Sequence, residues 1–158
     1  MNAATRLRWL ANLWPPFLFA GIRILEIDPE FRRVRVVLRH RFFNRNYVGT
    51  HFGGSLFSMA DPFWMILLIH RLGPGYTVWD KSAAIEFRKA VREAVYVKFL
   101  LADEVVDEIR EAARDGTPVT RWFETDITTA DGTVVATVRK EVHVRLRQRR
   151  ADAAPGAS

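Results

Sequence analysis

The stretch that decides the fold runs from Asn46 to Asp61 and reads NYVGTHFGGSLFSMAD. Its first part belongs to a polar, glycine-rich loop, which the composition places from Phe42 to Gly54. Its second part opens an apolar run from Ser55 to about Leu72, whose length favours a helix over a strand. Because a helix that is apolar on nearly all sides has to be buried, we expect Ser55–Leu72 to be the central helix of the core.

The chain before this stretch predicts a short helix and a hairpin. A helical apolar stripe runs from Thr5, the expected N-cap, to Leu13, and Pro15-Pro16 is the expected stop. Two strands follow, from Gly21 to Ile27 and from Arg32 to His40, with a turn between them.

The chain after the central helix predicts four more strands. They are Tyr76–Lys89, Val95–Leu101, Val119–Thr129 and Thr133–Arg147, with a helix over Asp103–Arg114 that has Asp103 as its N-cap. Ala130-Asp131-Gly132 is a hairpin signal between the last two strands. We therefore predict an α+β fold in which an antiparallel sheet wraps around the buried helix. One domain is expected over residues 1–147, followed by a disordered tail over residues 148–158.

The composition of the chain limits the classes of molecule that the protein is expected to bind. The chain has 158 residues, no cysteine and a formal net charge of +6, which favours polyanions such as the phosphates of coenzyme A. No nucleic-acid-binding motif is present, and we expect no metal, no cofactor and no nucleic-acid partner. The apolar stretch from Trp9 to Ile24 is too short and too interrupted to span a bilayer, and it makes a poor signal peptide. We therefore expect a cytoplasmic protein with no membrane partner.

The quoted stretch also carries the candidate chemistry. Gly53 and Gly54 allow a substrate to approach the backbone closely. The first amides of the following helix have no internal partner, and the helix dipole favours negative charge there, which suits an oxyanion forming on a thioester carbonyl. Asp61 lies about two turns into the expected helix, where a carboxylate must face a polar pocket or a partner subunit.

The same residues resemble the signature of the PaaI-like branch of the hotdog thioesterase superfamily. That pattern has Asn, Gly, His-Gly-Gly and Leu-Ala-Asp at fixed spacing, and Asn46, Gly49, Gly53, Gly54 and Asp61 fall on its positions. Ala84–Glu93 is similar to the family's third strand and its basic end. Within that superfamily, the chain resembles the hotdog proteins grouped as DUF4442. One position departs from the pattern, because Phe52 occupies the place of the histidine and His51 stands one residue earlier.

The resemblance implies an acyl-CoA thioesterase that works as a dimer or tetramer with its site between subunits. Asp61 would be the general base or nucleophile, the amide of Gly54 or Ser55 would hold the carbonyl oxygen, and Asn46 would hold the water or the carbonyl. The glycine-rich loop and the basic end of the strand within Ala84–Glu93 would line the substrate-binding site. These lining residues would be Gly49, His51, Phe52, Gly53, Arg88, Lys89 and Arg92, the last three toward the phosphates of coenzyme A.

Two other functions stay open at this point. His51-Phe52 with Gly54 resembles the His-Phe-Pro-Gly loop of acyl-carrier-protein dehydratases, which predicts a dehydratase or hydratase. Phe52 in place of the histidine predicts instead a non-catalytic module that binds acyl thioesters. Single residues also have plainer interpretations: Asn46 as the cap of a turn, Asp61 as the partner of an arginine at a subunit interface, and the basic residues as a solvated edge.

Overall fold

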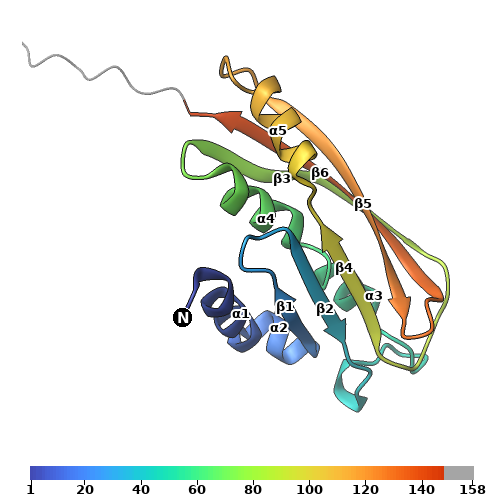
Figure 1. Ribbon diagram of the computed structural model, residues 1–158. Coiled ribbons are helices and arrows are strands. Elements are labelled where there is room, and N and C mark those ends of the chain that lie inside the picture. Colours follow the sequence, from blue (N-terminus) through green and yellow to red (C-terminus); the bar gives the residue numbers. More distant parts are fainter. Residues whose placement is uncertain (148–158) are drawn as a thin grey trace, which may run out of the picture.

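Six strands form one antiparallel sheet in the computed structural model, which describes residues 1–147 (Figure 1). In chain order they are β1 (Ile22–Ile27), β2 (Arg33–Leu38), β3 (Tyr76–Phe87), β4 (Val95–Leu100), β5 (Val119–Thr129) and β6 (Val134–Leu146). The order across the sheet is β1-β2-β4-β5-β6-β3, so β1 and β3 are its edges. The predicted α+β fold is confirmed, as is each predicted strand, whereas the predicted disordered tail lies outside the described residues.

The N-terminal segment forms two helices where one was predicted. The helices are α1 (Ala3–Leu13), α2 (Pro15–Ala20), α3 (Gly53–Ser58), α4 (Phe63–Leu72) and α5 (Asp103–Ala112), with a 3-10 turn over Phe42–Asn44. Asn2 caps α1 by accepting from the Thr5 amide at 2.8 Å, so Thr5 is not the N-cap. Pro15-Pro16 ends α1 as predicted and also begins α2, because the fixed φ of proline suits the first turn of a helix.

The central helix is broken, which corrects the prediction of one helix over Ser55–Leu72. It consists of α3 and α4, separated by residues 59–62. Pro62 explains the break, because proline has no amide to donate, its ring would clash with the Ser58 carbonyl, and the preceding residue is disfavoured in helical conformation. Asp61 therefore lies in a bend between two helices and not within one.

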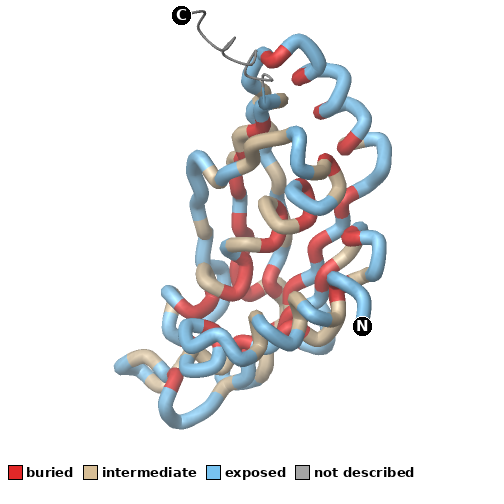
Figure 2. The backbone as a smooth tube through the Cα atoms, turned by 90° about the vertical axis from the view of Figure 1, so that its left-hand side faces the viewer, coloured by how far each residue is buried: buried red, intermediate tan, exposed pale blue. Residues whose placement is uncertain are grey.

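The sheet wraps around α4 and makes the core with it. Phe63, Trp64, Leu67, Leu68 and Leu72 of α4 are buried. More buried and more exposed positions alternate along β4, β5 and the second half of β6 (Figure 2), as the period of two predicts. Across this interface Trp64 stacks on Phe123 with 4.5 Å between ring centroids. The predicted arrangement of a sheet around a buried helix is confirmed for α4.

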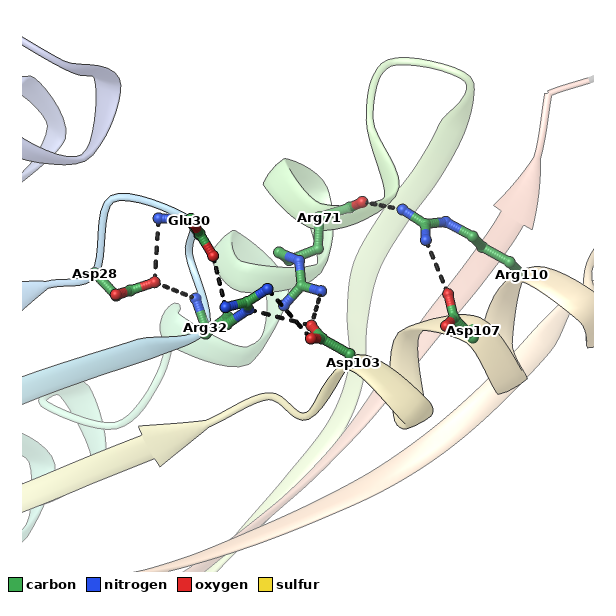
Figure 3. A network of polar contacts seen from close by, with 7 residues as sticks. All are labelled: Asp28, Glu30, Arg32, Arg71, Asp103, Asp107 and Arg110. Carbon is green, nitrogen blue, oxygen red and sulfur yellow. Dashed lines mark hydrogen bonds and ion pairs between the residues drawn. The ribbon is translucent and has the colours of Figure 1, made fainter.

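An ion-pair network joins the β1–β2 turn, the end of α4 and the start of α5 (Figure 3). Arg71 at the end of α4 and Arg32 before β2 both donate to the carboxylate of Asp103. Asp103 is thus not the predicted N-cap of α5, since Ala102 occupies that place and the carboxylate is used by the arginines. The bond from Arg71 is the main cause that lowers the pKa of Asp103.

Candidate functional site

Asn46 organises the loop that leads into α3. Its side-chain oxygen accepts from the backbone amides of Val48 (3.2 Å) and Thr50 (2.9 Å). Its side-chain nitrogen donates to the Thr50 hydroxyl (2.8 Å) and to the His51 carbonyl (3.0 Å). These four bonds use both donors and both lone pairs of the amide, as in the turn-capping alternative that the sequence left open.

His51 is buried at the end of this loop, with 5% of its surface exposed. Its Nε2 lies 2.7 Å from the Glu93 carbonyl, and because a carbonyl only accepts, Nε2 carries the proton. Nδ1 is then the acceptor nitrogen, and it is buried without a hydrogen-bond partner within residues 1–147. Burial lowers the pKa of His51, against the opposing effect of its bond to Glu93, so the ring is a neutral acceptor.

This burial predicts a pH dependence of stability. A folded-state pKa below the unfolded value of 6.5 means that the unfolded chain takes up more protons, so stability falls as pH drops through 6.5. His51→Gln keeps a donor for the Glu93 carbonyl and does not titrate. We expect urea unfolding of this variant between pH 7 and pH 5 to show a shallower fall in unfolding free energy than the wild type shows.

His70 is the comparison for this experiment, because burial also lowers its pKa. The single variants should each flatten part of the curve, and His51→Gln with His70→Gln should flatten it most. An unchanged slope for His51→Gln would show that the ring does not titrate with folding.

The amides at the start of α3 are not equivalent. The Ser55 amide donates to the Phe52 carbonyl at 3.0 Å, so one of the two predicted oxyanion donors is already used. The Gly54 amide makes no hydrogen bond within the described part of the chain. The Phe52 ring, 55% exposed, lies so close to Gly54 that a methyl group there would overlap it. With six residues, α3 is also too short to supply the strong dipole expected of a long helix.

A cavity of about 390 Å³ joins the loop to the end of β3. It is lined by Asn46, Thr50, His51, Gly53, Leu56, Phe87, Arg88, Lys89, Ala90, Val91 and Val135. The structure thus brings together five of the predicted site residues, which come from segments about forty positions apart. The lining does not include the others, namely Gly49, Phe52, Gly54, Ser55, Asp61 and Arg92.

The three predicted phosphate-binding residues lie in different surroundings. The Arg88 guanidinium donates to the Thr137 hydroxyl at 3.2 Å and to the Glu86 carboxylate at 3.0 Å. Arg92 donates to the Val48 carbonyl at 3.3 Å and so braces the Asn46 loop. Lys89 lines the cavity and is exposed. Only Arg88 and Lys89 therefore lie at the cavity itself.

Asp61 belongs to a charged cluster beyond the C-terminal end of α3. Its carboxylate, on a side chain that is 55% exposed, lies 2.5 Å from Nζ of Lys140. Lys140 is 2% exposed, donates also to the Asp61 carbonyl and lies 2.9 Å from the Asp80 carboxylate. Burial raises the pKa of Asp80 and the bond to Lys140 opposes that shift. The cluster therefore fixes both the side chain and the backbone of Asp61.

Lys140 and Asp80 were not among the predicted site residues. The signal for Lys140 was present, because it stands on the same side of the last strand as Val138 and Val142, where a charge needs a partner. Asp80 gave no such signal. It precedes a register shift between Asp80 and Ser82, and this bulge in β3 has no mark in the sequence.

The described residues offer no metal site and no membrane span. Residues 1–147 hold no group of three histidine, aspartate or glutamate side chains arranged for a metal ion. None of their helices is long and apolar enough to cross a bilayer.

A sheet wrapped around a central helix, with a glycine-rich loop at the start of that helix, defines a hotdog-fold protein. The family model described as "Domain of unknown function (DUF4442)" matches residues 4–144, and the chain belongs to this family. No curated protein sequence matches the chain.

Several solved structures share the fold. A Pseudomonas aeruginosa protein of unknown function, described as a probable thioesterase, is 22% identical with a TM-score of 0.78, over 93% of this chain and 99% of that one. A Haemophilus influenzae thioesterase is 15% identical with a TM-score of 0.66, over 95% and 96%. A hypothetical thioesterase from Streptococcus pneumoniae, solved with coenzyme A, is 20% identical with a TM-score of 0.54, over 82% and 91%. At these identities the likeness shows the fold.

Proposed function

We propose that the protein hydrolyses acyl-CoA or a similar acyl thioester at a site between two subunits. The observation that carries this proposal is the cavity that gathers the Asn46 loop, His51, Gly53 and the basic end of β3 in one place. The fold shared with thioesterases supports it, as does the bound coenzyme A in one of them.

The chemistry uses the Gly54 amide and the second carboxylate oxygen of Asp61, since Lys140 donates to Oδ1. The Gly54 amide would donate to the carbonyl oxygen as negative charge develops on it. Asp61 would take a proton from water as the water attacks the carbonyl carbon. The carbon–sulfur bond then breaks as the proton held by Asp61 passes to the departing sulfur, so the products are the carboxylic acid and the thiol of the carrier, and Asp61 is a carboxylate again. Asn46 acts indirectly, by fixing the loop that presents Gly53 and Gly54.

Chain geometry favours Asp61 from a second subunit. Gly54 lies in the first turn of α3, whereas Asp61 lies beyond the end of this helix, in the bend over residues 59–62. The rest of α3 therefore separates the Asp61 carboxylate from a carbonyl held at the Gly54 amide of the same chain. An Asp61 supplied by a neighbouring subunit would remove this gap.

The edge strand β3 is the surface that we propose for subunit pairing. It has 12 residues, most of them exposed, and only β6 pairs with it in the described chain. The opposite edge is different, because α1 packs on β1. A long open edge invites another strand, and a two-fold dimer satisfies it on both copies at once.

We expect light scattering to show a dimer or a larger oligomer at micromolar concentration. Ala83→Lys with Ala84→Lys, both at exposed positions of β3, should shift the protein toward monomer, because a two-fold axis would place like charges opposite each other. Leu100→Lys, an exposed change at the end of β4, is the control. A wild-type protein that stays monomeric would contradict the shared site.

A second cavity lies next to Asp61 and suits an acyl chain. It has a volume of about 230 Å³, larger than the ~150 Å³ apolar cavity that admits benzene. Its lining is apolar: Leu7, Ala11, Trp14, Phe17, Ile24, Ile27, Pro62, Phe63 and Ile66. Pro62 directly follows Asp61, so a chain lodged here would place its carbonyl end toward the carboxylate.

Arg88→Ala with Lys89→Ala, the two predicted phosphate-binding residues that line the cavity, should raise the KM for acyl-CoA more than it lowers kcat, because phosphate contacts are made equally in the ground and transition states. Glu86→Gln is the matched variant, since it frees Arg88 from its carboxylate partner and should lower KM. Steady-state kinetics on acyl-CoA and on an acyl-pantetheine without the nucleotide measure both. Equal effects on the two substrates would argue against phosphate contact.

A binding module without catalysis is the second candidate, and the Phe52 ring against Gly54 favours it. A dehydratase is less favoured, because Nε2 of His51 is already used by the Glu93 carbonyl. One set of assays separates the three functions. Hydrolysis releases a free thiol from acyl-CoA, hydration changes the absorbance of enoyl-CoA, and binding alone gives a thermal shift without turnover.

A further inference from the structure

The two N-terminal helices leave an apolar face uncovered. Ala4, Leu7 and Ala11 of α1 pack on the core, yet α1 is also apolar on the opposite side. Six large apolar side chains between 50% and 74% exposed follow one another here: Trp9, Leu10, Leu13, Trp14, Leu18 and Phe19. An apolar face of this extent marks an interaction surface.

Positive charge predominates around this apolar face. The first 60 residues contain nine arginines and three carboxylates, Glu26, Asp28 and Glu30. Glu26 and Glu30 form ion pairs with Arg32, Arg33 and Arg35, and Asp28 accepts from backbone amides in the turn. The other six arginines have no ion pair within residues 1–147: Arg6, Arg8, Arg23, Arg39, Arg41 and Arg45.

A groove of about 410 Å³ brings the apolar and the basic residues together. Trp9, Leu13 and Leu18 form its apolar part, with Phe43 beside them. Arg23, Arg39 and Arg41 line the same groove. Exposed aromatic side chains favour the headgroup region of a bilayer, and unpaired arginines bind anionic lipids. A surface that combines the two is typical of proteins that bind anionic membranes peripherally.

We propose that the α1–α2 face docks the protein onto anionic phospholipid membranes. Charge argues against a second copy of this chain as the occupant, because a two-fold interface would bring Arg23, Arg39 and Arg41 of both copies together. This inference does not depend on the proposed catalytic activity, and it differs from the sequence-based expectation of no membrane partner. The bilayer contact is peripheral, by partial insertion of side chains.

Vesicle sedimentation tests the proposal with the full chain. The probes are phosphatidylcholine vesicles with and without about a quarter phosphatidylglycerol, at low and physiological salt. We expect binding to the anionic vesicles, weakened by salt, and about tenfold or more weaker binding for Arg39→Glu with Arg41→Glu. Leu10→Ser with Phe19→Ser, both remote from the core, should weaken it similarly.

The matched control is Lys98→Glu with Arg114→Glu, which makes the same change in net charge at exposed positions outside the groove. This control should keep most of the binding. Equal losses in the control and the groove variant would overturn the proposal, as would absence of sedimentation with anionic vesicles. A lipid-independent change of oligomeric state in Leu10→Ser with Phe19→Ser, without vesicle binding by the wild type, would assign the face to a second copy instead.

Discussion

Asp61→Asn is expected to lower turnover on acyl-CoA by about 10²-fold or more, with little change in KM. Asparagine nearly matches aspartate in shape, and its oxygen can still accept from Lys140. The fold and the oligomer should therefore persist, as circular dichroism and light scattering would show. The variant lacks only the group that takes the proton from water.

Asp80→Asn is the control for this experiment, because Asp80 is the other carboxylate bound by Lys140. It removes a charge from the same cluster and should reduce turnover much less. If Asp80→Asn abolished turnover and Asp61→Asn kept it, the two carboxylates would have been assigned the wrong roles. His51→Gln should also cost little, and loss of activity in that variant alone would favour the histidine-based dehydratase site.

Lys140→Met is expected to reduce the free energy of unfolding by about 2–3 kcal/mol. Methionine matches the length of the lysine stem but leaves Asp61 and Asp80 near each other without a cation. Removing one partner of a fully buried ion pair costs roughly 3–5 kcal/mol, and the exposure of Asp61 reduces this cost. Urea denaturation at neutral pH measures the loss.

The pH dependence of this loss distinguishes the charged cluster from simple packing. A raised folded-state pKa means that the folded protein holds its proton at Asp80 more tightly than the unfolded chain, so stability falls as pH rises above the unfolded value of 3.8. Without Lys140 nothing opposes that shift. The cost of Lys140→Met should therefore grow from pH 4 to pH 8, whereas a cost that is constant across this range would indicate a packing defect alone.

The sequence predicted most of the fold because its signals were local. Alternation identified the strands, and the turn over Ala130-Asp131-Gly132 set the last hairpin, where the Gly132 amide donates to the Thr129 carbonyl. The break at Pro62 was the main error. Pro62 is a helix-breaking residue, but the long apolar run over Ser55–Leu72 favoured a single helix in the prediction. Asp61 was therefore predicted to lie within a helix.

The candidate site was predicted less completely because it depends on contacts between distant segments. The bond from His51 to the Glu93 carbonyl joins positions 42 residues apart, and Lys140 reaches Asp61 across 79 residues. No local sequence pattern predicts such pairs of contacting residues. The four hydrogen bonds of the Asn46 side chain are local contacts within its own loop. The interpretation of Asn46 as the cap of a turn predicted them from the sequence.

Release of coenzyme A from an acyl-CoA series, acetyl to palmitoyl, is the direct test of thioester hydrolysis with Asp61 as the general base. The wild type and Asp61→Asn would be assayed side by side with a thiol reagent. We expect turnover by the wild type on at least one chain length and a loss of about 10²-fold or more in the variant. Absence of turnover by the wild type on every chain length, with a thermal shift on binding, would contradict it and establish a binding module instead.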